Sequence, residues 1–233
     1  MVKSKKLYSK LKRLLFVLLL LIITFFTYVE IANRNSINMT YRQKVLKAIY
    51  PAWMWITKLA GKNAEELSGS KEPPVSFYLQ KAILNNGDTL DFGNLKGKKV
   101  LLVNTASNCG YTNQYDDLQK LSEENKDKLV VLGFPANDFK EQEKGTDTAI
   151  AEFCRINFGV TFQLMQKSSV IKSPQQNLVF QWLTDATKNG WNSKGPTWNF
   201  SKYLVDEKGV LINYFDPSVS PSSEVVKQAI EKK

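Results

Sequence analysis

The 233-residue chain contains no histidine and only two cysteines, Cys109 and Cys154. Without histidine there can be no Ser-His-Asp triad, no Cys-His pair and no His-ligated zinc, copper or haem site. Two cysteines so far apart in the sequence form neither a zinc framework nor the Cys-x-x-Cys motif of dithiol reductases. A glycine-rich phosphate loop of Walker or Rossmann spacing is also absent. We therefore expect no metal and no cofactor, which leaves the chemistry of a lone thiol.

The positive charge is concentrated in the N-terminal part of the chain. The net charge is +10, but residues 1–70 hold 12 Lys/Arg and 3 Asp/Glu, which leaves 20 and 19 for residues 71–233. A protein that binds nucleic acid through its folded body would carry a basic face there. We therefore expect no nucleic-acid partner.

An uncharged apolar run follows a basic N-terminus. Residues 1–13 carry six Lys/Arg, and the sixteen residues Leu14–Val29 carry no charge. A membrane-spanning helix needs about 20 apolar residues, and flanking residues can extend a slightly short run. A cleaved signal peptide needs small residues before the cut, whereas Glu30 stands three residues before a cut after Ala32. The pattern favours an uncleaved transmembrane signal anchor at 14–32 over a cleaved signal or a buried core helix.

Basic residues on the two sides of this run predict its orientation. Six Lys/Arg precede it, and four follow it within about twenty residues. The positive-inside rule then places the N-terminus inside and the following domain on the extracytoplasmic (periplasmic) side of a single-pass membrane protein.

The composition of residues 33–74 predicts a stalk or linker with an amphipathic helix. The stretch RQKVLKAIYPAWMWITKLAG mixes lysines with aromatic residues, which suits a membrane interface. A helix packed on the following domain explains the same composition, and both interpretations stay open. Residues 69–74, GSKEPP, have the composition of a linker, so we expect the globular domain to span residues 75–233.

The body alternates strand and helix patterns. Asn86-Gly87 predicts a hairpin, and the apolar runs 100–103 and 129–134 predict buried strands. Helices are expected after residue 112, over 146–158, from Pro174 and at the C-terminus, with a second hairpin turning at 206–209. This order implies an α/β domain with a central mixed β-sheet flanked by helices, which the thioredoxin-like fold satisfies.

Cys109 lies in VNTASNCGYT, between a predicted strand and a predicted helix. Backbone amides at a helix N-terminus stabilise an anion, so a thiol there loses its proton more readily. Three neutral donors could support the thiolate: Gln142, beyond the end of the second predicted strand, and Trp198 and Asn199, before the second predicted hairpin. Taken singly, each has an ordinary structural interpretation, and a lone buried cysteine is more often inert packing.

Together, four stretches resemble the signature of the glutathione peroxidase family, in the form of a cysteine-containing, non-selenium bacterial member. They are VNTASNCGYT, GFPANDFKEQEKG, FCRINFGVTF and WNFSKYLVDEKG. The resemblance covers about residues 75–230 and implies a thioredoxin fold. It also implies a thiol-dependent peroxidase that reduces hydrogen peroxide and organic or lipid hydroperoxides. Carried over by motif, Cys109 is the peroxidatic residue, and Gln142, Trp198 and Asn199 complete a tetrad around its sulfur.

The same resemblance implies the partners. A hydroperoxide oxidises Cys109 to a sulfenic acid, which an external thiol, glutathione or a thioredoxin-like protein, then reduces. The chain lacks the glycine-rich insertion of tetrameric members, which indicates a monomer. Cys154 falls about one position before the expected resolving cysteine, on the apolar face with Ile150 and Phe158, which favours a structural role. The alternative function is a membrane-anchored thioredoxin-fold interaction or chaperone module without peroxidase turnover.

Overall fold

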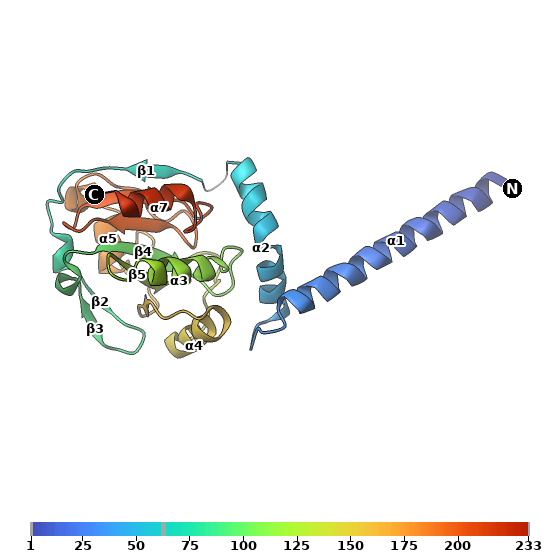
Figure 1. Cartoon of the computed structure of the whole chain (residues 1–233), viewed down its shortest axis with the longest axis horizontal. Helices are drawn as coiled ribbons and strands as arrows, with labels where there is room; N and C mark the ends of the chain where they lie inside the picture. The colour runs from blue at the N-terminus through green and yellow to red at the C-terminus, as the bar shows by residue number, and fades with distance from the viewer. Residues whose placement is uncertain (1, 62–63, 233) are drawn as a thin grey trace.

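The protein consists of a globular α/β body and a long helix that projects from it (Figure 1). A computed structural model describes residues 2–61 and 64–232. Within these residues, six strands form a mixed sheet in the order β1-β8-β7-β4-β5-β6, and β2 and β3 form a separate hairpin. The strands are β1 (Glu66–Ser68), β2 (Lys81–Ile83), β3 (Thr89–Asp91), β4 (Lys99–Thr105), β5 (Leu129–Pro135), β6 (Gln163–Leu164), β7 (Lys202–Val205) and β8 (Leu211–Phe215).

The sheet has a parallel half and an antiparallel half. β4, β5 and β6 run parallel, whereas β7 runs antiparallel to β4 and to β8. The α-helices are α1 (Val2–Ala32), α2 (Tyr41–Leu59), α3 (Gln114–Glu124), α4 (Asp147–Phe158), α5 (Leu178–Leu183), α6 (Ala186–Asn189) and α7 (Glu224–Glu231). Two short 3-10 helices, η1 (Phe77–Leu79) and η2 (Phe92–Leu95), flank the hairpin. The expected mixed sheet flanked by helices is confirmed.

Two apolar layers cover the two faces of the sheet. Alternate residues of β4 point to opposite faces, so Leu101 and Val103 join a cluster with α3, α4 and α7. Val100 and Leu102 join the other cluster, which includes α5 and the hairpin region. Every residue of β4 is buried, as expected for a central strand covered on both sides.

One expected helix is interrupted. The segment from Pro174 forms α5 and α6 rather than one continuous helix. The Thr184 hydroxyl donates to the Phe180 carbonyl at 2.8 Å, and the Asp185 carboxylate accepts from the Thr187 amide at 3.0 Å. Asp185 therefore acts as the N-cap of a new helix and ends the previous one.

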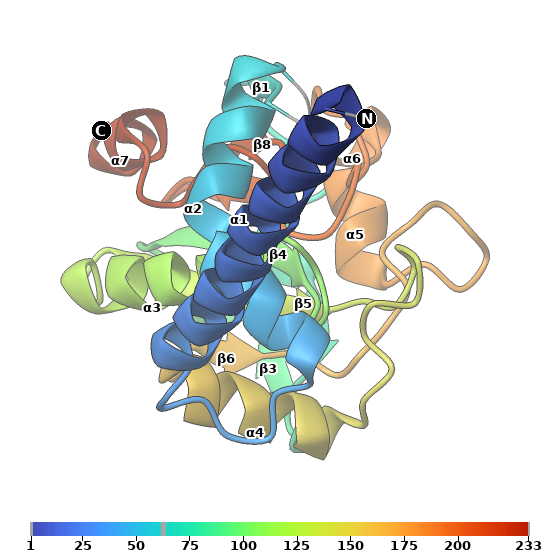
Figure 2. The ribbon, with the colours of Figure 1, turned by 90° about the vertical axis from the view of Figure 1, so that its right-hand side faces the viewer.

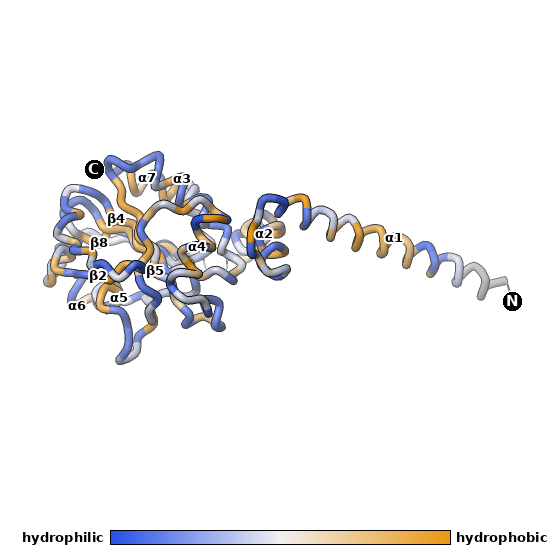
Figure 3. The backbone as a smooth tube through the Cα atoms, turned by 90° about the horizontal axis from the view of Figure 1, so that it is seen from below, coloured by the Kyte–Doolittle hydropathy of each residue, from blue (hydrophilic) through white to orange (hydrophobic). Residues whose placement is uncertain are grey.

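The N-terminal helix α1 is long and apolar enough to cross a membrane. Its Tyr8–Ala32 portion contains 25 residues, which at 1.5 Å per residue span about 37 Å, against a hydrocarbon core of about 30 Å. Figure 3 shows the apolar stretch between more hydrophilic ends, well away from the body.

Helix α2 packs on the body, as the second interpretation of this segment predicted. It buries Ala48, Tyr50 and Thr57, whereas Trp55 and Leu59 face outward. The end of α1 holds α2 through the Lys44–Glu30 ion pair at 3.0 Å. Residues 66–68, within the expected linker, form β1 and pair with the edge of β8. The segment before the body is thus attached to it by a helix and by a strand.

Candidate active site

Three loops meet at one end of the sheet, beyond the carboxyl ends of β4 and β5. The loop after β4 carries Cys109, and the loop after β5 carries Gln142; these two strands are parallel, so both loops leave from their carboxyl ends. β7 is antiparallel to β4, with Val103 opposite Lys202, so the loop before β7 arrives at the same end. That loop carries Trp198 and Asn199. The sheet topology therefore brings the four candidate site residues to one end of the sheet.

Asn104, at the end of β4, joins its loop to the loop before β7. Its side-chain amide donates to the Trp198 carbonyl at 3.1 Å and its side-chain oxygen accepts from the Ser201 amide at 3.0 Å. Phe200 adopts a left-handed backbone with φ of 70°, which is strained for a non-glycine residue and costs about 1–3 kcal/mol. This turn positions the preceding Asn199 in the site.

Cys109 sits in a turn rather than in the first turn of α3. The helix begins at Gln114, and Thr112 does not cap it. The Thr112 hydroxyl accepts from the Cys109 amide at 2.9 Å and donates to the Ala106 carbonyl at 2.8 Å, so it fixes the cysteine loop. The Tyr111 amide donates to the Cys109 sulfur at 3.4 Å. A backbone amide therefore does approach the sulfur, but from the turn and not from the helix.

The Cys109 sulfur is deeply buried, with 1% of the residue exposed. Burial raises the pKa of the thiol from 9.0 to about 11, because the thiolate is poorly solvated there. Hydrogen bonds from the Tyr111 amide, Trp198 and Asn199, together with the positive charge of Arg42, lower the pKa and offset part of this effect. The prediction that Cys109 loses its proton easily is therefore wrong for the buried position that this structure shows. The expected donors Trp198 and Asn199 are nevertheless present beside the sulfur.

Gln142 is linked to Asn199 beside the sulfur. The Asn199 side-chain nitrogen donates to the Gln142 side-chain oxygen at 3.1 Å, while the Asn199 side-chain oxygen has no hydrogen-bond partner among the described residues. Both side chains are at least nine-tenths buried. Gln142 thus orients Asn199, and one polar oxygen is left over inside the site.

Glu143, which the sequence places beside Gln142 beyond the second predicted strand but to which it assigns no role, joins two of the loops. Its carboxylate accepts from the Ser107 amide at 2.7 Å and from the Ser107 hydroxyl at 3.0 Å. The Asn108 amide donates to the neighbouring Gln142 carbonyl at 3.1 Å. Burial raises the pKa of the Glu143 carboxyl to about 7, and the bonds from Ser107 act in the opposite direction. The carboxyl therefore fixes Gln142 relative to the cysteine loop.

Helix α2 covers this end of the body (Figure 2). Thr40 and Gln43 form a capping box, in which the Gln43 side-chain oxygen accepts from the Thr40 amide at 2.8 Å. The Gln43 side-chain nitrogen donates to the Ser107 carbonyl at 2.9 Å. Further along, the rings of Trp53 and Tyr111 meet edge to face at 6.3 Å. The Thr40-x-x-Gln43 spacing could have predicted the cap, but not the contact with a loop 64 positions away.

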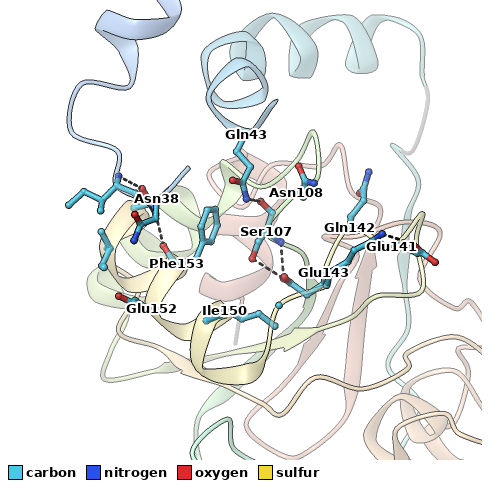
Figure 4. A pocket seen from close by; sticks show the side chains of 16 residues that line it. Asn38, Gln43, Ser107, Asn108, Glu141, Gln142, Glu143, Ile150, Glu152 and Phe153 are labelled. Atoms are coloured by element: carbon cyan, nitrogen blue, oxygen red, sulfur yellow. Dashed lines mark hydrogen bonds and ion pairs between the residues drawn. The ribbon is translucent and has the colours of Figure 1, made fainter. Parts of the chain in front are cut away.

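Cavities lie on both sides of Gln142. One, of about 530 Å³, lies between α4, the loop 141–145 and α2 (Figure 4). Glu141, Glu143 and Glu152 make its lining acidic, with Lys144 as a counter-charge. The second, of about 460 Å³, lies under α2 and reaches Gly110, Gln142 and Trp198. Cys109 itself borders a void of only about 10 Å³, which is about the space of one water molecule.

The comparisons with known proteins agree with this arrangement. The family model described as Glutathione peroxidase matches residues 77–184. "Glutathione peroxidase homolog BsaA" of Staphylococcus epidermidis is 44% identical over 157 residues, which cover 67% of this chain and 95% of that protein. The chain belongs to the glutathione peroxidase family.

Two further comparisons agree with this assignment to the glutathione peroxidase family. "Glutathione peroxidase" of Lactococcus lactis subsp. cremoris is 42% identical, with 68% of this chain and 99% of that protein covered. A crystal structure of T. cruzi GPX1 has a TM-score of 0.53 at 25% identity, covering 67% of this chain and 94% of that one. The 159 residues aligned with the Lactococcus protein leave 74 of the 233 residues without a counterpart there. The family model begins after α1, α2 and β1.

Cys154 is as buried as Cys109 and belongs to the same apolar cluster, but fewer hydrogen-bond donors lie around its sulfur. It lies on α4 with no exposed surface, in the same apolar cluster as Ile150 and Phe158. Burial raises its pKa to about 12, and a hydrogen bond with Tyr115 lowers it only in part. Both cysteines are free thiols. These surroundings support packing as the role of Cys154.

Proposed function

We propose that the protein is a thiol-dependent peroxidase in which Cys109 is the peroxidatic residue. The observation that carries this proposal is the meeting of Cys109, Trp198, Asn199 and Gln142 at one end of the sheet in a member of the glutathione peroxidase family. The interaction or chaperone alternative gains no support from the relatives, whose names describe peroxidases and peroxiredoxins.

The reaction begins with an attack of the Cys109 thiolate on one oxygen of a hydroperoxide. A sulfur–oxygen bond forms as the oxygen–oxygen bond breaks, and the leaving oxygen takes a proton to become an alcohol or water. The cysteine is oxidised to a sulfenic acid and the peroxide is reduced. A first external thiol then forms a mixed disulfide with Cys109 and releases water. A second thiol regenerates the Cys109 thiol and leaves as a disulfide.

The neighbouring side chains have distinct roles in this scheme. Trp198 and Asn199 donate hydrogen bonds to the sulfur, which favours the thiolate. Gln142 accepts from Asn199 and so holds that amide in place. The unpartnered Asn199 side-chain oxygen can accept the proton of a hydroperoxide group, which would bring the peroxide next to the sulfur.

The reductant in this proposal is an external thiol, glutathione or a thioredoxin-like protein, because Cys154 packs on the buried face of α4 with Ile150 and Phe158 and burial raises its pKa to about 12. We further propose that the chain is a monomer anchored by α1, with its body on the extracytoplasmic side. The excess of basic residues before the apolar run supports that orientation. Residues 75–233 would form the peroxidase domain, after a basic segment at 1–13, an anchor at 14–32 and a stalk at 33–74.

The test uses the full chain in detergent. Hydrogen peroxide and each candidate thiol are supplied, peroxide consumption is followed, and the oxidised residue is located by mass spectrometry with a sulfenic-acid trap. We expect trapping on Cys109, no turnover in Cys109→Ser, and retained turnover in the matched variant Cys154→Ala. If Cys109→Ser still consumes peroxide at the wild-type rate, the proposal is wrong. A Cys109–Cys154 disulfide would instead assign a resolving role to Cys154.

A further inference from the structure

Helix α2 forms a second wall opposite the candidate site residues. The side chains that line the 460 Å³ cavity from α2 recur at helical spacing and therefore share one face: Arg42, Leu46, Ile49, Trp53 and Thr57. Gln142 and Trp198 line the cavity from the body. The volume lies within the range of about 300–1,000 Å³ that small-molecule sites occupy. The cavity is thus shared between α2 and the residues around the sulfur.

The lining of this cavity combines apolar surface with positive charge. Leu46, Ile49 and Trp53 provide the apolar part on the α2 side. Among the described residues, Arg42 and Lys140 are the charged members of the lining, and no Asp or Glu side chain contributes to it. The Lys140 ammonium lies 5.6 Å from the ring centre of Trp198, so one of the two cations is directly beside the proposed donor to Cys109. A ligand with an apolar chain and one acidic group matches this lining.

The neighbouring cavity shows the opposite charge. Its lining includes Glu141, Glu143 and Glu152 against one cation, Lys144, which is ion-paired with Glu141 at 2.7 Å, so it attracts an anion less than the α2 side does. Gln142 separates the two spaces, so an anionic amphiphile that approaches the sulfur is favoured on the α2 side. The wall that α2 contributes to the 460 Å³ cavity lies outside the matched family region, because the family model begins at residue 77, after α2.

We infer that the α2 face formed by Leu46, Ile49 and Trp53 is the second wall of the peroxide site, and that this wall selects an acyl-chain hydroperoxide with an acidic group over hydrogen peroxide. The inference rests on the proposed peroxidase function and adds to it an element outside the matched family region. Trp53 is the specificity-determining residue, since it contacts both the cavity and the cysteine loop. A β-carbon placed on Gly110 would lie 3.4 Å from the Trp53 indole nitrogen.

The experiment compares kcat/KM for three peroxides with the full chain in one detergent. They are linoleic acid hydroperoxide, its methyl ester and hydrogen peroxide. Trp53→Ala is compared with Trp55→Ala, a substitution on the same helix whose side chain is 65% exposed and does not line the cavity. Arg42→Gln tests the charge. A lysophosphatidylglycerol hydroperoxide, which carries a phosphate instead of a carboxylate, shows which source of acidic amphiphile is preferred.

In Trp53→Ala we expect the ratio of kcat/KM for linoleic acid hydroperoxide to that for hydrogen peroxide to fall about 10- to 100-fold, because a large apolar contact is removed. In Trp55→Ala the ratio stays at the wild-type value. Arg42→Gln lowers kcat/KM for the acid relative to the methyl ester by about tenfold.

Two failures can be told apart. If the wild-type protein reduces none of the peroxides, the proposed function fails and the inference fails with it. If the wild-type protein reduces hydrogen peroxide but Trp53→Ala and Trp55→Ala give the same ratio, the second wall is wrong and the peroxidase function stands. Equal kcat/KM for acid and ester in wild type would overturn the charge selection, whichever source of the amphiphile is used.

Discussion

Cys109 should ionise at an unusually high pH as long as α2 covers it. Burial moves its pKa from 9.0 to about 11. At pH 8 about one thiol in a thousand is then ionised, against about one in ten for an unburied thiol, so alkylation should be about 100-fold slower. The difference of two pKa units corresponds to about 3 kcal/mol. The thiolate becomes the main form only as the pH rises through 11.

Trp53→Ala is the perturbation that tests burial as the cause. The indole lies against Gly110 and Tyr111, so its removal should admit water beside the sulfur. Water stabilises the thiolate, and we expect the pKa of Cys109 to fall by about one unit toward its usual value. The alkylation rate near pH 8 should therefore rise about tenfold, since one unit is a factor of ten in thiolate.

The assay measures the rate of iodoacetamide labelling from pH 6 to pH 11, with the labelled residue identified by mass spectrometry. Trp55→Ala, which changes an outward-facing indole of the same helix, should keep the wild-type profile. A wild-type midpoint below pH 9 would refute the reasoning, because it would mean that the donors from Tyr111, Trp198 and Asn199 outweigh burial. Identical profiles for Trp53→Ala and wild type would show that the Trp53 indole is not the cause.

Two other buried ionisable groups give independent predictions of stability. The pKa of the Glu143 carboxyl is about 7 in the folded protein, against 4.5 when it is exposed. The protonated carboxyl therefore contributes fully to the free energy of unfolding below pH 4.5. This contribution, up to about 3 kcal/mol, is lost as the pH rises through 7. Urea titrations at pH 5 and pH 8 should show this loss in wild type but not in Glu143→Gln, and a loss of equal size in the variant would contradict the assignment. The Lys202 ammonium donates to the Gln114 side chain at 2.9 Å and to the Phe200 carbonyl at 2.6 Å. Lys202→Met should lower the free energy of unfolding by about 2–4 kcal/mol, because these acceptors lose their donor. The exposed Lys208→Met is the matched control, and equal urea midpoints for the two variants would rule out that effect.

The central part of the fold could be predicted from local patterns. The apolar runs at 100–103 and 129–134 became β4 and β5, and the Asn86-Gly87 turn joins β2 to β3. These patterns are reliable because each is decided within a few residues by burial and turn chemistry. The break between α5 and α6 was missed because Asp185 caps a new helix inside an otherwise continuous helical pattern.

The site was only partly predictable for a different reason. The motif stretches placed Cys109, Gln142, Trp198 and Asn199 in loops, and the parallel and antiparallel pairing of β4 then explains why those loops meet. The small closed void beside Cys109 could not be foreseen, because residues of α2, among them Gln43 and Leu46, line it together with the cysteine loop. The contact of Gln43 with Ser107 joins residues 64 positions apart, and no local pattern predicts such a contact.

The short connection from α2 to the edge strand β1 has a consequence for the equilibrium between docked and undocked α2. Only six residues, 60–65, separate the two elements, and β1 is fixed to β8. A helix tethered so closely experiences an effective local concentration in the millimolar range. Docking with an intrinsic dissociation constant of about 0.1 mM, far too weak to hold a separate peptide at cellular protein concentrations, would keep α2 docked about nine-tenths of the time. An undocked population of about one-tenth is therefore compatible with a predominantly covered cysteine, and the proportion of covered molecules is independent of protein concentration.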